Sequence, residues 1–205
     1  MASYGRSSLR DLFDDAPTPH IAHPPHTHHR DFYLATDGSF RDTGGGLGAV
    51  IQTRDGQRVT RVSVPHQAPD NNVAEYRALH LGLDVLSNRS PAEARVGLLV
   101  DHDQLAANVN AAVLAAHDTR ATPHQISVPH DTGLHWRGIR ARLREFGAVR
   151  AARIPSDRNP AHPLANAPEE YRHLDAGSER CLRPAPVDDG QPIPPPSRAD
   201  RTVSD

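Results

Sequence analysis

The sequence has a single cysteine and no lysine among its 205 residues. One cysteine excludes an internal disulfide framework. No stretch is long and apolar enough for a membrane span or a secretory signal, so we expect a cytoplasmic protein without a membrane partner. The net charge is only -2, which excludes an overall basic field as the source of any affinity for nucleic acid. Such contacts would have to come from arginines placed locally, although genome composition is the simpler explanation for the arginine usage.

Proline and histidine gather at the two ends of the chain. Residues 1–30 contain a histidine-rich run at 23–29, and residues 174–205 contain three consecutive prolines at 194–196. Because such sequences cannot form a core, we expect a disordered arm over 1–30, one folded domain over 31–173, a disordered tail over 174–205, and a monomer. The histidines also allow the hypothesis of a metal-handling protein, in which the arm alone binds zinc or nickel.

Three successive strands are predicted at the start of the domain. Apolar and polar residues alternate from Phe32, and a glycine-rich turn follows at 44–46. A second strand covers 47–53, the pair Asp55-Gly56 is typical of a hairpin turn, and a third strand covers 58–64 before Pro65. This pattern predicts an antiparallel meander.

The rest of the domain alternates helices with two more strands. Apolar residues at helical spacing predict the helices, short apolar runs predict the strands, and glycines and prolines mark their ends. The first half contains a helix through Tyr76–Leu86, a buried strand at 96–100, a helix at about 104–116 and a loop at 117–132. The second half contains a helix from Trp136 ended by Gly147, a strand at 148–154, a loop at 155–159, and a last helix that starts at Pro160 with Asn159 as its cap. The order predicts an α/β fold with a mixed five-stranded sheet, three antiparallel strands plus two parallel ones, flanked by helices.

Three acidic residues stand at points where such a fold places ligands. Asp101 directly follows five apolar residues, at the lip of a buried strand, and Asp103 is its alternative. Asp37 interrupts an apolar strand, although a turn aspartate also fits there. Glu75 begins a helix from which its side chain can project toward a strand, although its spacing from Asn72 also fits a capping box.

Three segments resemble, in order, the motifs of the ribonuclease H family: Thr36 to Ser39 with the glycines behind it, Asn71 to Leu79, and Arg158 to Asn166. The strand ending at Asp101 occupies the place of the family's third acid. The resemblance covers roughly 31–171 and is closer to the short archaeal-type members. It implies a ribonuclease H-like sheet and an endonuclease that hydrolyses the RNA strand of an RNA–DNA hybrid. It also implies that Asp37, Glu75 and Asp101 hold two Mg²⁺ or Mn²⁺ ions, which activate a water and stabilise the departing oxygen.

His162 stands where the family's last motif normally has an aspartate. By position it belongs to the catalytic and metal-ligating set. An imidazole removes one negative charge and suits manganese better than magnesium, so we expect activity shifted toward manganese. The alternative is a module that binds nucleic acid or a protein partner without cutting.

The resemblance also implies the residues that contact the hybrid. Gly38 and Ser39 would lie against the nucleic acid, and Asn71 and Asn72 would reach the minor groove, where 2′-hydroxyls distinguish RNA from DNA. Helix capping is the alternative role for one of the two asparagines. One helix carries four arginines, for which a solvated face is the simpler interpretation and phosphate binding the alternative: Arg137, Arg140, Arg142 and Arg144.

Overall fold

The computed structural model describes residues 8–16, 30–42, 44–117 and 126–171. The strands are β1 (Phe32–Ser39), β2 (Gly45–Thr53), β3 (Arg58–His66), β4 (Arg95–Val100) and β5 (Ala148–Arg153). The helices are α1 (Leu9–Asp15), α2 (Asn71–Ser87), α3 (Asp103–His117), α4 (Gly133–Leu143), α5 (His162–Asn166) and α6 (Pro168–Tyr171), with short 3-10 turns η1 (His130–Thr132) and η2 (Ser156–Arg158).

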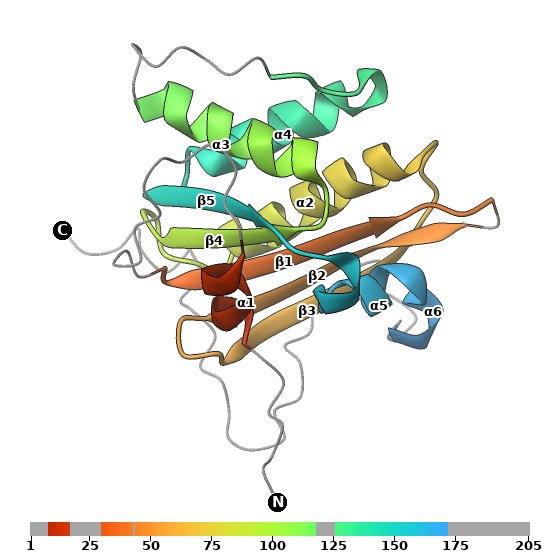
Figure 1. The fold of residues 1–205 in the computed structure, drawn as a ribbon, viewed down its shortest axis with the longest axis horizontal. Coiled ribbons are helices and arrows are strands. Elements are labelled where there is room, and N and C mark those ends of the chain that lie inside the picture. The colour runs from red at the N-terminus through yellow and green to blue at the C-terminus, as the bar shows by residue number, and fades with distance from the viewer. Residues whose placement is uncertain (1–7, 17–29, 43, 118–125, 172–205) are drawn as a thin grey trace, which may run out of the picture.

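The five strands form one mixed sheet in the order β3-β2-β1-β4-β5 (Figure 1). β1 pairs antiparallel with β2, and β2 pairs antiparallel with β3, which makes the predicted meander. β4 lies parallel to both β1 and β5. The predicted fold class is therefore confirmed. Pro65 does not end β3, because β3 is an edge strand, where a missing N–H costs no ladder bond.

Helices cover both faces of the sheet (Figure 1). α2, α3 and α4 share the larger core with alternate residues of the strands, including Leu34, Val96 and Leu98. α1 and α5 share a second core with the opposite face, built on Tyr33 and Leu99 among others. Each strand residue thus belongs to a definite face, as the period-2 geometry of a strand requires.

The prediction that the whole arm 1–30 is disordered was wrong for residues 9–15. Ser8 and Asp11 form a capping box at the start of α1. Leu9, Leu12 and Phe13 are buried, and the Phe13 ring meets Tyr33 edge-on at 5.6 Å between centroids. Two turns of helix are too short to show a clear period in sequence. The histidine-rich run and the tail lie outside the described residues, so the metal-handling hypothesis stays a prediction.

Several helix ends differ from the predicted ones. α4 ends at Leu143, so Phe146 is a buried residue of the following turn and not part of the helix. Gly147 serves a different purpose, because a Cβ there would lie 2.4 Å from the Glu93 carbonyl oxygen. α5 begins at His162, with Ala161 at the cap position in place of Asn159. The Asn159 amide donates to the Thr36 carbonyl over 2.8 Å, and its Oδ1 accepts from the Ala161 backbone over 3.0 Å.

Among the described residues, no helix is both long enough and apolar enough to cross a membrane. The cytoplasmic location and the monomeric state stay predictions.

Candidate active site

The parallel pairing of β1 and β4 brings two of the predicted acids together. Ala35 is in register with Leu99, and two residues further along each chain stand Asp37 and Asp101. The carboxyl ends of parallel strands meet at one edge of a sheet, so both carboxyl groups lie at that edge. Asp37 is only 2% exposed. Asp101 is less buried, and its Oδ2 accepts a hydrogen bond of 2.7 Å from the Ser156 hydroxyl.

Glu75 reaches the same edge from α2 because Gly38 lets the helix approach the strand. A Cβ on Gly38 would lie 2.2 Å from the carbonyl carbon of Ala74 and 2.5 Å from the backbone nitrogen of Glu75. Only glycine permits this contact of two backbones. The Glu75 side chain is almost wholly buried, and the charges of both Asp101 and Asp37 act on it. The Gly38 of the predicted motif is thus a structural requirement for bringing the acids together.

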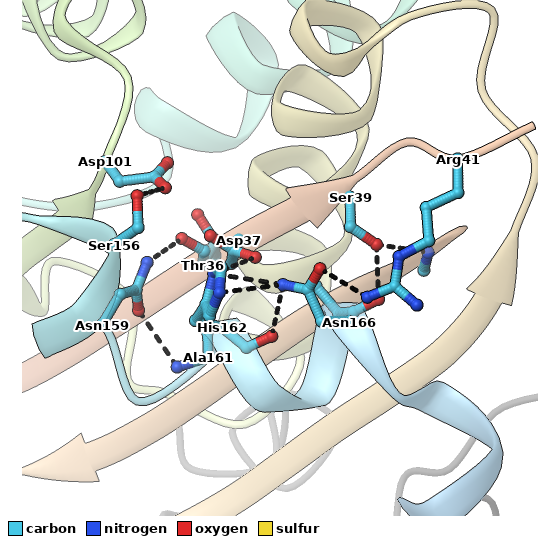
Figure 2. A network of polar contacts seen from close by, with 12 residues as sticks. Thr36, Asp37, Ser39, Arg41, Asp101, Ser156, Asn159, Ala161, His162 and Asn166 are labelled. Atoms are coloured by element: carbon cyan, nitrogen blue, oxygen red, sulfur yellow. Dashed lines mark hydrogen bonds and ion pairs between the residues drawn. The ribbon is translucent and has the colours of Figure 1, made fainter. Parts of the chain in front are cut away.

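His162 completes the group from α5. Its Nδ1 lies 3.4 Å from Asp37 Oδ2, and its side chain is 44% exposed. Asp37, Asp101 and His162 each offer one ligand atom, and these atoms lie within 4.8 Å of one another (Figure 2). Asp103 lies outside this group, because it starts α3 and pairs with Arg153 at 3.5 Å. The structure therefore favours Asp101 over its alternative.

Hydrogen bonds from the meander hold α5 against the sheet. The Ser39 hydroxyl donates to the Ala165 carbonyl, and the Ser63 hydroxyl donates to the Leu164 carbonyl, both over 2.6 Å. Ser39 also accepts from the Gly46 backbone, so its hydroxyl is committed inside the protein. The Ser39 hydroxyl thus has a structural role, and contact between Ser39 and nucleic acid stays a prediction.

Two carboxyl groups of this site, those of Asp37 and Glu75, resist ionisation. Burial raises the pKa of Asp37 to about 8, and the charge of Asp101 and a hydrogen bond with it contribute further. Burial also raises the pKa of Glu75 well above its usual range, followed by the charges of Asp101 and Asp37. Like charges that lose their water disfavour the ionised form. Without a cation, Asp37 and Glu75 therefore hold at least one proton between them near neutral pH.

The same arrangement fits a divalent cation. The donor set is three carboxyl groups and one imidazole, and Glu75 Oε2 is buried without a hydrogen-bond partner. An unpaired buried carboxylate oxygen is costly unless something positive satisfies it. Oxygen donors suit Mg²⁺ and Mn²⁺, and the imidazole shifts the balance toward Mn²⁺.

A second layer of polar residues surrounds His162, and the sequence interpretation missed it. The Asn166 amide lies 3.1 Å from His162 Nδ1 and 3.0 Å from its carbonyl oxygen. Asn166 Oδ1 in turn accepts a 3.0 Å hydrogen bond from Arg41, so a chain runs from Arg41 to the site (Figure 2). The position of Asn166 four residues after His162 is the one available signal, because i and i+4 share a helix face.

Asn71 and Asn72 are exposed at the start of α2, a few residues before Glu75 in the sequence. Neither caps the helix, since Asp70 does so by accepting from the Val73 backbone over 2.8 Å. Asn72 Oδ1 instead accepts from His102 Nε2 over 2.8 Å. His102 Nδ1 accepts from the Leu105 backbone and so caps α3. Asn72 is thereby tied to the segment that follows Asp101.

The four arginines of the α4 region do not behave alike. Arg142 forms ion pairs with Asp84 and Glu145. The other three are exposed, and two of them, Arg137 and Arg140, lie on α4 itself. Arg142 therefore links α4 to α2 through Asp84, and phosphate binding stays a prediction for the other three arginines.

Comparisons with known proteins find relatives by sequence and by structure. A family model described as reverse transcriptase-like matches residues 35–120, a range that contains Asp37, Glu75 and Asp101 and ends before His162. No curated protein matches the sequence significantly.

Solved structures resemble most of the described chain. The N-terminal RNase H domain of Rv2228c from Mycobacterium tuberculosis is 22% identical, with 65% of this chain and 95% of that chain covered and a TM-score of 0.50. RNase H1 from Halobacterium salinarum is 22% identical, with 69% and 98% covered and a TM-score of 0.52. LC11-RNase H1, solved in complex with an RNA/DNA hybrid, is 20% identical, with 69% and 99% covered and a TM-score of 0.52. The protein has the ribonuclease H fold.

Proposed function

We propose that this protein is an endonuclease that hydrolyses the RNA strand of RNA–DNA hybrids with the help of two divalent cations. The observation that carries the proposal is the meeting of Asp37, Asp101 and His162 within 4.8 Å, with Glu75 buried beside them. These groups come from four separate segments of the chain, and a core gains no stability from such a cluster. The fold, shared with RNase H1 enzymes, adds independent support.

Each residue of the site has a distinct task in this proposal. Asp37, Glu75, Asp101 and His162 would hold the cations, which when bound polarise a water and neutralise charge on the phosphodiester. The water oxygen forms a new bond to phosphorus while the bond to O3′ breaks. The products then carry a 5′-phosphate and a 3′-hydroxyl. Ser156 fixes the rotamer of Asp101 through its 2.7 Å hydrogen bond.

Recognition of the RNA strand would fall to the start of α2. The bond from His102 occupies Asn72 Oδ1 and leaves the Nδ2 group as a donor to a 2′-hydroxyl. Asn71 is exposed beside it. The backbone of Gly38 and Ser39 would face the scissile strand from β1.

A binding module without cleavage is the second candidate, and one observation favours it. His162 replaces a carboxylate and is 44% exposed, so the site carries less charge for cations than the family's motif provides. Three acidic groups still suffice for a two-cation site, and for that reason we place the endonuclease first.

The decisive experiment incubates the protein with a labelled RNA–DNA hybrid in Mg²⁺ and, separately, in Mn²⁺. Wild type should cut faster in Mn²⁺, Asp37→Asn should not cut, and His162→Asp should gain activity in Mg²⁺. RNA and DNA duplexes of the same sequence serve as controls. Equal cutting by wild type and Asp37→Asn would contradict the assignment, whereas a silent wild type with an active His162→Asp would establish the binding module.

A further inference from the structure

Two buried arginines lie at the opposite end of the sheet from the acidic site. Arg30 lies two residues before the start of β1, and Arg150 lies on β5 in the same cross-strand row as Gly97 and Tyr33. This row belongs to the face on which α1 packs, since Tyr33 contacts Phe13. Arg30 and Asp37 are separated by the length of β1, about 20 Å at the rise of a strand.

Both guanidinium groups are buried without the partners that buried charges require. Arg30 is 7% exposed and Arg150 is 5% exposed. The Nε of each residue and the Nη2 of Arg150 lack any hydrogen-bond acceptor. Guanidinium N–H groups nearly always find acceptors when buried, so three orphaned donors in one place are unusual.

The acids of this region form their ion pairs with other arginines, and only the charges of Tyr33 and Asp31 act to raise the pKa of Arg30. Asp31 accepts from the Arg95 backbone over 2.8 Å and pairs with the Arg95 side chain at 3.7 Å. Asp14 of α1 pairs with Arg10 at 3.6 Å. Within the described ranges, neither carboxylate forms an ion pair with Arg30 or Arg150.

The two arginines also repel each other. Burial lowers the pKa of Arg30, and the charge of Arg150 lowers it further. Burial likewise lowers the pKa of Arg150. An arginine keeps its proton at any physiological pH, so this pair cannot relieve the repulsion by losing one. The remaining way to stabilise the pair is a negative counter-charge.

We propose that Arg30 and Arg150 form an oxyanion site for a phosphate group, separate from the acidic site. Planar guanidinium donors match tetrahedral oxyanions through paired N–H contacts, and phosphate accepts from several donors at once. A Cβ on Gly97 would lie 2.8 Å from the Tyr33 ring and 3.1 Å from the Phe13 ring, so these two rings pack against the row and cover one side of the site. The near-complete burial of both arginines favours a small free phosphate or a terminal phosphate monoester over the backbone of a duplex.

The first test measures thermal unfolding in EDTA, with chloride replaced by inorganic phosphate at constant ionic strength. An anion that binds only the folded state raises its stability by RT ln(1 + [L]/Kd). Wild type should show a Tm rise in phosphate that is absent in chloride. Arg150→Met and Arg30→Met should each lose this rise, because methionine keeps the apolar stem and removes the charge. Arg95→Met is the matched control and should keep the rise, because Arg95 is half exposed and already paired with Asp31.

The second test separates the sources of the phosphate and does not depend on the variants. Titration calorimetry of wild type in EDTA should show binding of inorganic phosphate and of adenosine 5′-monophosphate. Prior addition of an RNA–DNA hybrid that lacks terminal phosphates should leave both titrations unchanged, because a duplex backbone does not enter this site. Equal phosphate effects in wild type, Arg150→Met and Arg95→Met would overturn the proposal, as would the lack of any effect of phosphate beyond chloride. Hybrid cleavage should be unchanged in Arg150→Met, so failure here leaves the proposed endonuclease untouched.

Discussion

The two ends of the central sheet each bury groups of like charge, but they differ in how the repulsion can be relieved. At the carboxyl ends of β1 and β4, Asp37 and Glu75 have raised pKa values and can take up a proton. At the other end, Arg30 and Arg150 stay charged. The acidic end can therefore exist without a bound cation, because its carboxyl groups can become neutral by taking up a proton. The basic end depends on a negative counter-ion. Cation loading and pH should govern the first end, and anion loading the second.

The largest effect should come from removing a carboxylate of the acidic end. Asp37→Asn should lower hybrid cleavage by about 1000-fold or more, the scale seen when a group that acts directly in catalysis is lost. The matched control is Asp103→Asn, because Asp103 lies two residues from Asp101 yet is exposed and paired with Arg153. Single-turnover rates on a labelled hybrid measure both. A comparable loss in Asp103→Asn would mean that the wrong aspartate had been assigned.

Gly38→Ala should have the second-largest effect, and this effect should arise from the packing between β1 and α2. Its Cβ would meet the backbone of Ala74 at 2.2 Å, so the helix must move away and carry Glu75 with it. Overpacking of backbone against backbone should cost about 3 kcal/mol of unfolding free energy. Denaturant unfolding measures the loss, and Gly133→Ala is the control, because a Cβ at Gly133 meets nothing within 4 Å. Equal stability of the two variants would contradict the close approach of strand and helix.

The sequence was sufficient to predict the parts of the molecule that follow a regular period. The five strands and the face of each strand follow from the apolar runs and their alternation, and the convergence of Asp37 with Asp101 was implied by the resemblance of the motifs. The hydrogen-bonding partners of the site did not follow, because Ser156 lies in a three-residue 3-10 turn and Asn166 in a five-residue helix, both too short to show a period. Arg150 was equally hidden, since one arginine among the alternating residues of β5 is typical of an edge strand that faces solvent.

The acidic end should make stability depend on pH when no cation is present. The pKa of Asp37 is raised in the folded state, so folding favours the protonated form. Stability is therefore complete below the unfolded pKa near 4 and is lost as the pH rises toward about 8. Thermal scans in EDTA from pH 5 to pH 8 should show a fall in Tm of about 5 °C, and Mn²⁺ should remove most of it. Asp37→Asn should flatten the curve in EDTA, and an unchanged slope in that variant would place the titrating group elsewhere.

The smallest effect should come from the chain that orients His162. Asn166→Ala removes the amide that contacts the imidazole and should raise the Mn²⁺ concentration needed for half-maximal cleavage about 10-fold, the scale of losing an outer partner of a metal ligand. Arg41→Ala should raise it less, because Arg41 acts only through Asn166. The control is the same Asn166→Ala change in a His162→Ala background, where it should have no further effect on the Mn²⁺ requirement. A full effect in that background would show that Asn166 stabilises α5 generally and does not position the histidine.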